Sequence, residues 1–280
     1  IANGVSKLHG EVSRDMWKEY TGICPIIHIT NAQNKKYWAD AWLEEAFQNK
    51  DREAFIKRKT RLKSKLFDVV ADQTGKLFDS NIFTIVWARR FADYKRPDLI
   101  TRDYNRFIKL LENIDRPVQI IFAGKPYPSD YGAIHNFDNL THISKNIKNM
   151  AVLTGHELKL SRQLKEGADV WLNNPRVTRE ASGTSGMTAA MNGAVNFSTN
   201  DGWVREFKDL NKTKNSFVLP IIDHNLPAHE QDDLDLVNLY EMLENEVLPI
   251  YYDSPKKWWD LVETSMKQVS PYFESGRMVD

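Results

Sequence analysis

Five short runs of apolar residues occupy the middle of the chain, and they restrict the folds that it can adopt. They lack regular polar alternation, so each run predicts a strand that is buried on both faces. The runs are residues 83–88, 118–123, 150–153, 169–172 and 194–198. Helical patterns separate them, beginning at Pro97, at Leu158 and in the Ala/Met-rich stretch that ends at Gly193. Strands that alternate with helices in this way predict an α/β fold with a doubly wound parallel sheet, covered by helices on both faces.

The segments on either side of this region are expected to be mainly helical. The expected elements are a helix over 12–20, a short strand over 24–30, a long helical stretch over 41–72, loops and small elements over 200–233, and amphipathic helices over 234–250 and 255–269. We therefore expect three parts: an N-terminal flanking helical segment over 1–75, the sheet domain over 76–233, and C-terminal helices packing on it over 234–280.

Ligands of parallel α/β sheets bind beyond the carboxyl ends of the strands, which directs attention to the loops after Ala88, Ala123 and Leu172. The first loop holds four cations within eight residues, Arg89, Arg90, Lys95 and Arg96. This cluster suits one or two phosphate groups, with arginine as a fork and lysine as a point charge, although a solvated basic loop explains the run equally well. The Gly124–Lys125 pair in the second loop favours a surface lysine.

The stretch from Arg179 to Gly193 places small residues ahead of the short Ala/Met helix. Residues 182–186, Ser-Gly-Thr-Ser-Gly, offer backbone amides to an anion at a helix N-terminus. A helix capped by Ser182 or Thr184 is the alternative, and the density of glycine favours the close approach of a ligand. Glu180 precedes these residues and could accept hydrogen bonds from sugar hydroxyls.

Composition narrows the class of protein. The formal net charge is zero, which gives no support for a broad nucleic-acid or membrane surface. Cys24 is the only cysteine, so no intrachain disulfide can form, and a reducing compartment such as the cytoplasm fits. We expect neither a membrane span nor a signal peptide. Because the chain opens without methionine, we expect an excised piece of a longer protein.

The histidines His9, His28, His142 and His156 show no metal-ligand spacing, and we expect no metal site. The sequence also shows no Ser-His-Asp or Cys-His pattern that would indicate a nucleophilic triad.

Several of these stretches resemble the α-glucan (glycogen/maltodextrin) phosphorylases, and in particular their shorter bacterial and archaeal branch. The resemblance rests on residues 87–97, 122–125, 169–175 and 180–187, with support from 3–9, 243–249 and 277–279. It covers nearly the whole chain in the order that the family has.

The resemblance implies that this chain is the C-terminal half of a glycosyltransferase with two Rossmann-like domains (GT-B). The family transfers a glucosyl unit between an α-1,4-glucan and phosphate, with retention of configuration and with glucose 1-phosphate as the sugar phosphate. Its cofactor is pyridoxal phosphate, whose phosphate group assists the substrate phosphate. The expected partners are therefore glucan, phosphate and an N-terminal domain of the same protein, and a homodimer is left open.

The resemblance also implies a role for each matching residue. Arg90 and Lys95 would hold the substrate phosphate as catalytic residues. The cofactor phosphate would be held by Arg89, Gly183 and the backbone of Thr184 and Ser185. The glucosyl hydroxyls would be bound by Glu180, Ala181, Ser182 and Gly183. These roles agree with the anion site that the residues themselves suggest.

The chain departs from the family at the position of the cofactor lysine. In the family, Gly-Met is followed by the lysine that forms the Schiff base, and here that position is Thr188. Threonine has no amine, so either pyridoxal phosphate binds non-covalently through its phosphate or the protein does not use it. The loop over 30–34 also differs from the family pattern.

Three functions remain open at this point. The first is a phosphorylase-like glucosyltransferase, and we expect this chain alone to bind an anion without turning over. The second is a nucleotide-sugar-dependent transferase of the glycogen-synthase kind, although such enzymes usually carry glutamate where Thr188 stands. The third is a catalytically inactive glucan-binding homologue.

Overall fold

A six-stranded parallel sheet forms the centre of the computed structural model, which describes residues 1–155 and 157–278. The strands are β3 Phe83–Ala88, β4 Val118–Ala123, β5 Met150–Leu153, β6 Val170–Asn173, β7 Val195–Ser198 and β8 Phe217–Val218. Their spatial order is β5-β4-β3-β6-β7-β8, and every neighbouring pair is parallel. This is the doubly wound order 3-2-1-4-5-6, so the strand order reverses between β3 and β6. The predicted α/β fold with a parallel sheet is confirmed.

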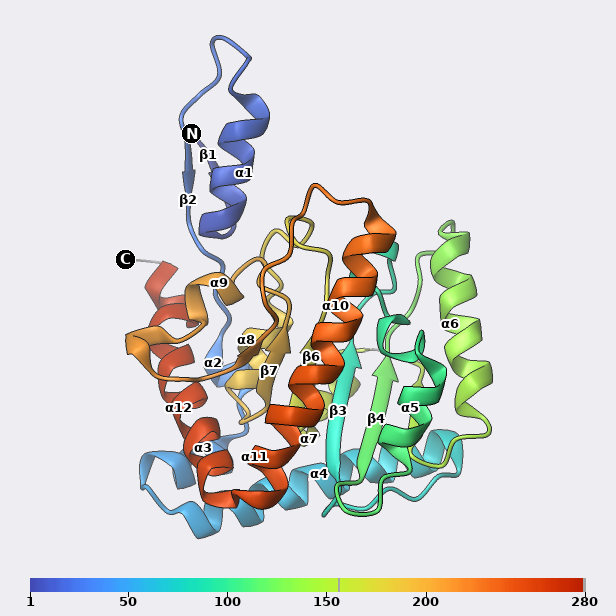
Figure 1. Ribbon diagram of the computed structural model, residues 1–280. Coiled ribbons are helices and arrows are strands. Elements are labelled where there is room, and N and C mark those ends of the chain that lie inside the picture. The colour runs from blue at the N-terminus through green and yellow to red at the C-terminus, as the bar shows by residue number, and fades with distance from the viewer. Residues whose placement is uncertain (156, 279–280) are drawn as a thin grey trace.

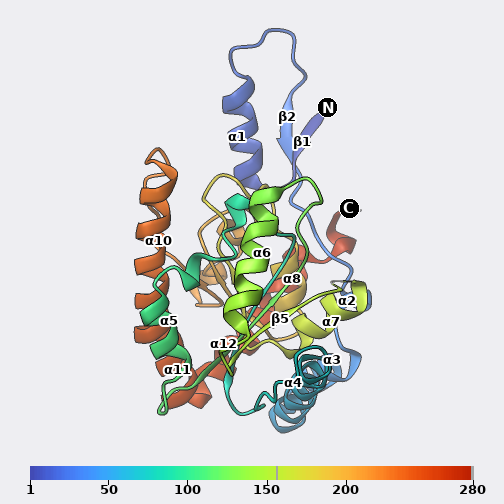
Figure 2. The same cartoon turned by 90° about the vertical axis from the view of Figure 1, so that its right-hand side faces the viewer.

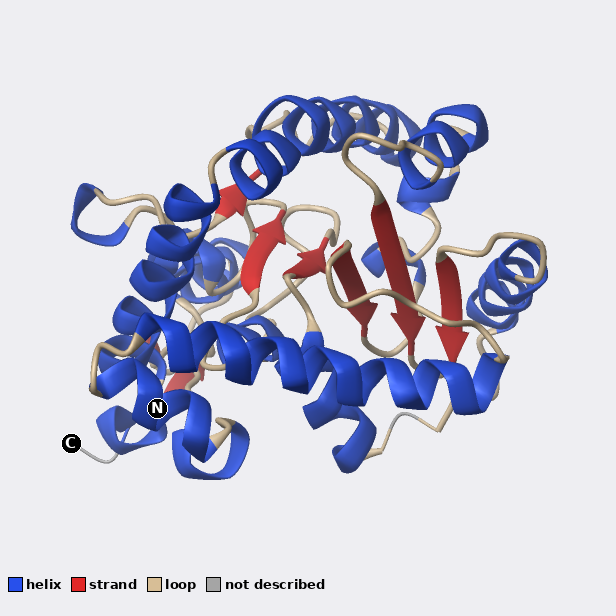
Figure 3. Ribbon diagram, turned by 90° about the horizontal axis from the view of Figure 1, so that it is seen from below, coloured by secondary structure: helices blue, strands red, loops and turns tan. Residues whose placement is uncertain are grey.

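Both faces of the sheet are buried under helices, as Figure 3 shows from below. The helices are α3 Ala41–Gln48, α4 Arg52–Thr74, α5 Tyr104–Leu111, α6 Tyr131–Ser144, α7 Leu158–Gly167, α8 Ser185–Ala190, α10 Ala228–Met242, α11 Leu248–Asp253 and α12 Pro255–Phe273. In β3, Ile85 and Trp87 belong to a core cluster shared with α5, α6, α10 and α12. Val86 and Ala88 belong to a second cluster shared with α4, α7 and α8. Two covered faces explain why the strands lack polar alternation.

The stretch expected to be helical over 41–72 is helical, but it is divided into two helices. It consists of α3 and α4, separated by Asn49, Lys50 and Asp51. Lys50 has a left-handed backbone conformation with φ of 57°, which no α-helix can contain. The Asp51 carboxylate then accepts the amide of Ala54 at 3.0 Å and so caps the start of α4.

Other helices begin at side-chain caps that the apolar pattern did not reveal. The first helix, α1 Lys7–Trp17, begins before the predicted Val12, because Ser6 accepts the amide of His9 at 3.1 Å. The helix expected from Pro97 begins only at Tyr104, after the 3-10 turns Asp93–Lys95 and Leu99–Thr101. The helix α6 and the strand β8 were not predicted. The remaining elements are β1 Ala2–Gly4, β2 Ile26–His28, α2 Lys35–Trp38, α9 Val204–Phe207, a π-turn Leu243–Val247, and 3-10 turns Leu210–Lys212 and Ser275–Met278.

The N-terminal elements α1, β1 and β2 form an arm that stands clear of the sheet domain (Figures 1 and 2). The strands β1 and β2 pair in parallel, and α1 packs beside them. The foot of the arm is bonded to the body, since the Ser6 hydroxyl donates to the Ala181 carbonyl at 2.6 Å. One serine therefore both caps α1 and holds the loop that follows β6.

A buried ion network joins α10 to the loops after β3 and β6. The Arg96 side chain is fully buried and donates to Asp232 at 3.0 Å and to Asp235 at 2.7 Å. It also donates to two backbone carbonyls just after β6. Asp232 accepts further hydrogen bonds from Arg102 and Arg176, each at 2.7 Å. Arg96 of the predicted basic cluster is thus a structural residue that fixes the shape of the sheet edge.

Among the helices of the described residues, none combines the length and the apolar character that crossing a membrane requires.

Candidate functional site

A cavity of about 390 Å³ lies at the carboxyl edge of the sheet, where the strand order reverses between β3 and β6. It is lined by Val5, Asn31, Ala88, Arg89, Lys95, Ser161, Glu180, Ala181, Ser182, Gly183, Thr184 and Ser185. Most of the site residues predicted from the sequence therefore meet at one place. Arg90 and Thr188 do not line the cavity: Arg90 is exposed to solvent, and Thr188 is buried.

Two cations and one carboxylate form the charged centre of the cavity. Glu180 Oε2 lies 3.5 Å from Arg89 Nη1 and 3.5 Å from Lys95 Nζ. Burial lowers the pKa of Arg89, and the nearby Glu180 opposes that shift. Burial and then the charge of Arg89 lower the pKa of Lys95, again opposed by Glu180. An excess of positive charge in a partly desolvated cavity favours an anionic ligand.

Polar atoms beside this centre lack partners within the described part of the chain. Arg89 Nε and Ser182 Oγ are buried and form no hydrogen bond there. Buried polar groups are rarely left unpaired, so such atoms at a cavity indicate a polar ligand. Arg89 contributes a donor, while the Ser182 hydroxyl can donate or accept.

Asp201, which follows β7, holds the loop that carries Glu180. Its Oδ2 accepts the amide of Glu180 at 2.9 Å, and its Oδ1 accepts the amide of Gly202 at 2.9 Å. Gly202 has φ of 56°, and a Cβ there would lie 2.4 Å from the Ser182 carbonyl oxygen. Sequence reasoning missed Asp201 because it assigned residues 200–233 to loops. The available signal was a polar Asp-Gly pair just beyond a buried strand.

The Asp201 carboxyl group should make the stability of the protein depend on pH, and an Asp201→Asn variant should lack this dependence. Burial raises the pKa of Asp201 to about 6, although the amides of Glu180 and Gly202 lower it. The folded state therefore binds the proton more tightly than the unfolded chain does. The contribution of Asp201 to the free energy of unfolding is greatest below about pH 4 and declines by about 2–3 kcal/mol as the pH rises through 6.

Urea denaturation of the unaltered protein and the variant from about pH 4 to pH 7 measures this effect, because the two proteins share their other titrating groups. The free energy of unfolding of the unaltered protein should fall relative to that of the variant over this interval. Parallel curves, or a relative rise, would contradict it.

The predicted helix N-terminus is short, and its glycines serve different purposes. Helix α8 spans six residues, and its N-cap Thr184 makes no side-chain capping hydrogen bond. Gly186 is needed for packing, because a Cβ there would lie 2.3 Å from Asn196 Oδ1. Gly183, with φ of 81°, turns the chain beside the cavity. The anion-binding character of this edge therefore comes mainly from Arg89 and Lys95.

Thr188, which stands at the expected cofactor-lysine position, points back into its own helix. Its side chain is buried, and its hydroxyl donates to the Ser185 carbonyl at 2.9 Å. Its own carbonyl accepts the side-chain amide of Asn192 at 2.9 Å. The threonine therefore bonds to α8 and to the turn that follows it.

The described residues hold no group of three or more histidine, cysteine, aspartate or glutamate side chains that could bind a metal ion. His9 accepts the amide of Val5 through Nδ1 at 3.0 Å, so it has a structural role. His156 lies outside the described residues, as does Val279 of the C-terminal resemblance. Cys24 is exposed.

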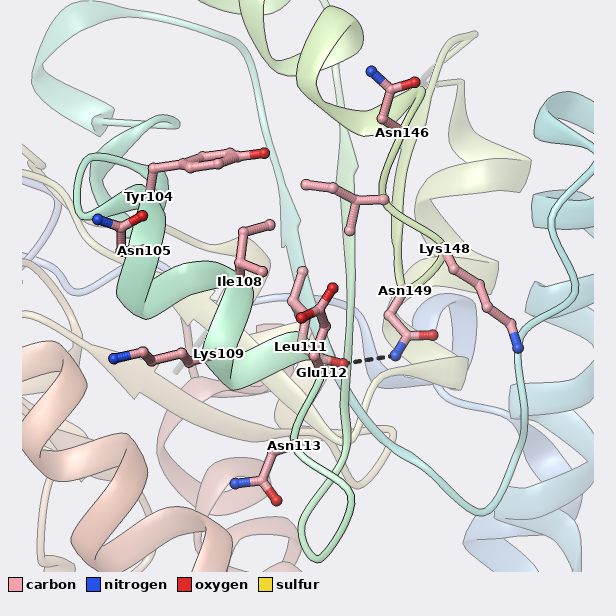
Figure 4. A pocket seen from close by; sticks show the side chains of 11 residues that line it. Tyr104, Asn105, Ile108, Lys109, Leu111, Glu112, Asn113, Asn146, Lys148 and Asn149 are labelled. Carbon is pink, nitrogen blue, oxygen red and sulfur yellow. Dashed lines mark hydrogen bonds between the residues drawn. The ribbon is translucent and has the colours of Figure 1, made fainter.

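A larger cavity of about 860 Å³ lies between α5 and the segment that connects α6 to β5 (Figure 4). Tyr104, Asn105 and Asn146 are among the side chains that line it, and Asn149 donates to the Leu111 carbonyl at 2.8 Å. It contains none of the predicted site residues. Size alone therefore does not identify the functional site.

Comparison with known proteins gives one consistent result. Residues 28–248 match the family model described as carbohydrate phosphorylase. Three relatives each align with 99% of this chain. The chain is 41% identical to an uncharacterized protein of Methanocaldococcus jannaschii, 34% identical to a maltodextrin phosphorylase of Thermococcus litoralis and 31% identical to a glycogen phosphorylase of Aquifex aeolicus. The matches cover 51%, 38% and 46% of those proteins, so the chain spans about half of their length or less.

Proposed function

The chain belongs to the carbohydrate phosphorylase family, and from this premise we propose that it carries the phosphate-binding part of an α-glucan phosphorylase-like site. The reaction would transfer a glucosyl unit between an α-1,4-glucan and phosphate, with glucose 1-phosphate as the sugar phosphate. One observation carries the proposal: Arg89, Glu180 and Lys95 form a charged centre where the strand order reverses. Within this centre, Arg89 Nε has no hydrogen-bond partner among the described residues.

The residues divide by chemistry into an anion side and a sugar side. Lys95 lies in the cavity, and Arg90 belongs to the same loop after β3. We therefore assign the substrate phosphate to this pair. Glu180 and Ser182 offer a carboxylate and a free hydroxyl, which suit the hydroxyl groups of a glucosyl unit. We also assign Ala181 and Gly183 to the sugar, through their backbone. Cations fixed beside the reacting phosphate would stabilise the negative charge that stays on it while the sugar becomes oxocarbenium-like.

Pyridoxal phosphate fits this cavity at one end only. Arg89, with its free Nε, and the Gly183–Ser185 backbone could hold the phosphate group. Thr188, at the position of the family's Schiff-base lysine, lies outside the cavity lining, has no amine, and has its hydroxyl already bonded inside α8. When bound, the cofactor would supply a phosphate group that assists the substrate phosphate. The residues of this chain would orient the two anions and neutralise their mutual repulsion.

We further propose that the sheet domain is the C-terminal domain of a GT-B glycosyltransferase and that a second domain supplies the remainder of the site. The strand order supports the first part, and the longer relatives support the second. The division at residues 75/76 and 233/234, a cytoplasmic location and a homodimer stay proposals.

The test is an assay for glucose 1-phosphate released from maltodextrin and phosphate, with and without added pyridoxal phosphate. We expect release by the natural-length protein that contains this chain, and none by the 280-residue chain alone. Turnover of a nucleotide sugar in place of phosphorolysis would assign the protein to the glycogen-synthase kind instead. Glucan binding without either reaction would make it an inactive homologue.

A further inference from the structure

The cavity of about 860 Å³ between α5 and the segment that connects α6 to β5 differs in chemistry from the charged candidate cavity (Figure 4). Of the eleven residues that line it, four are asparagines and only three carry a charge, namely Lys109, Glu112 and Lys148. An asparagine side chain both donates and accepts hydrogen bonds, which matches the hydroxyl groups of a sugar. The lining therefore suits a neutral ligand that is rich in hydroxyl groups.

The α5 wall of this cavity adds an apolar surface to the amides. Tyr104, Ile108 and Glu112 recur every four positions, so they share one face of the helix and of the residue that caps its end. Tyr104 is 50% exposed, and its ring extends toward the facing segment in Figure 4. One face of a pyranose ring consists of C–H groups and packs against an aromatic ring, while the hydroxyl groups reach polar partners around it. Tyr104 thus offers a contact surface for a sugar ring.

The charges of the lining favour a neutral ligand over an anion. In Figure 4 the ammonium groups of Lys109 and Lys148 extend away from the space between the two walls, whereas the Glu112 carboxylate points into it. A carboxylate accepts hydrogen bonds from hydroxyl groups and repels phosphate. The candidate cavity has the opposite character, because its two cations outnumber Glu180.

The second wall is a loop, but residues behind it and across from it hold it in place. Lys76, which does not line the cavity, donates to three backbone carbonyls within 144–150, two of them at 2.8 and 2.9 Å. The Asn149 side-chain amide donates to the Leu111 carbonyl at 2.8 Å and so joins the two walls. A site whose backbone is already fixed loses little conformational entropy when a ligand binds.

The cavity lies at the amino edge of the sheet. Both of its walls immediately precede strands, since α5 leads into β4 and the facing segment leads into β5. Because the strands are parallel, this edge is opposite the carboxyl edge that holds the candidate cavity. A ligand bound here is therefore remote from Arg89 and Lys95, and only a long polymer could occupy both cavities.

We propose that this cavity is a second carbohydrate site, which holds a stretch of α-1,4-glucan away from the chain end that reacts. Tyr104 and Ile108 would contact the apolar faces of the glucosyl rings. Glu112, Asn146 and Asn149 would form hydrogen bonds with their hydroxyl groups. A polymer anchored here keeps its other chain ends concentrated near the candidate cavity. The choice of glucan as the carbohydrate rests on the proposed function.

The experiment is isothermal titration calorimetry of maltoheptaose with the 280-residue chain and its Tyr104→Ala variant. Loss of the ring should weaken binding by about tenfold, whereas Tyr104→Phe keeps the ring and should bind as the unaltered chain does. Tyr104 is exposed and is the first residue of α5, so its replacement should leave the midpoint of urea denaturation nearly unchanged. If maltoheptaose does not bind the unaltered chain, or binds Tyr104→Ala equally well, the proposal is overturned.

Two further variants locate the effect. Tyr131→Ala is the matched control, because Tyr131 opens α6 directly after an aspartate cap, as Tyr104 opens α5. It is exposed and lies outside this cavity, so its loss should leave the affinity unchanged. Glu180→Gln, in the candidate cavity, should keep the binding that depends on Tyr104. Binding that is lost in Glu180→Gln and kept in Tyr104→Ala would place glucan at the candidate cavity alone and refute this inference.

Kinetics of the natural-length protein separate this inference from the proposed function. With both correct, Tyr104→Ala should raise the KM for long maltodextrin several-fold and leave kcat unchanged. The KM for maltotriose should not change, because a trisaccharide is too short to reach from one edge of the sheet to the other. Tyr104-dependent binding without phosphorolysis would refute the proposed function alone, whereas phosphorolysis with binding that ignores Tyr104 would refute this inference alone.

Discussion

Replacing Arg96 with methionine should lower the free energy of unfolding by about 3–5 kcal/mol, the usual cost of removing one partner from a buried ion pair. Its guanidinium is fully buried and is the only cation among the described residues bonded to Asp235. Asp232, in contrast, keeps Arg102 and Arg176. Burial already raises the pKa of Asp235, so the carboxyl group would be left unpaired in an environment that disfavours its charge. Urea denaturation measures the loss.

Arg116 provides the matched control for Arg96. It pairs with Asp253 at 2.5 Å, but the two side chains are 37% and 50% exposed, so Arg116→Gln should cost less than about 1 kcal/mol. The double variant Arg96→Met/Asp235→Leu should recover part of the stability, because it removes the stranded carboxylate. Equal losses for Arg96→Met and Arg116→Gln would show that the network contributes no more than a surface pair.

Replacing Lys95 with glutamine should weaken phosphate binding to this chain by about 10- to 100-fold, since a charge-assisted hydrogen bond contributes about 1.5–3 kcal/mol. Lys95 is one of the two cations in the cavity, and its ammonium group is held only loosely by Glu180, at 3.5 Å. It is therefore available to a stronger anion. Isothermal titration calorimetry with inorganic phosphate measures the change in affinity.

Lys125→Gln is the control for Lys95. Lys125 also follows a strand of the sheet, but it is exposed and lies outside the cavity lining. Its loss should leave the phosphate affinity unchanged. Equal weakening by both variants would mean that phosphate responds to the general charge of the sheet edge rather than to this cavity.

The sequence predicted the sheet well because its strands are buried on both faces. Runs such as 83–88 and 118–123 are apolar apart from Thr84 and Gln119, and they reappear as β3 and β4 with the same bounds. Their alternation with helices determined which ends of the strands share an edge. That edge then brought Arg89 and Lys95 close to Glu180, as the pattern of cations and small residues suggested.

What the sequence could not reveal depends on contacts between distant residues. The two-residue strand β8 is too short to produce an apolar pattern, and it is defined by pairing with β7. Asp201 acts through backbone amides more than twenty positions earlier, for which no local motif exists. The purpose of Gly186 is likewise visible only once Asn196 lies against it.

The reversal of strand order also has a consequence for how the chain folds. The strand β3 pairs with β4 over six residue pairs, but it joins β6 through only Ile85–Val170 and Val86–Trp171, about 85 positions apart. Closing so long a loop is entropically costly and is rewarded by few contacts, so each half of the sheet should assemble before the two halves meet. The cavity spans that last seam. Ligand affinity should therefore appear only when the final long-range pairing forms during refolding.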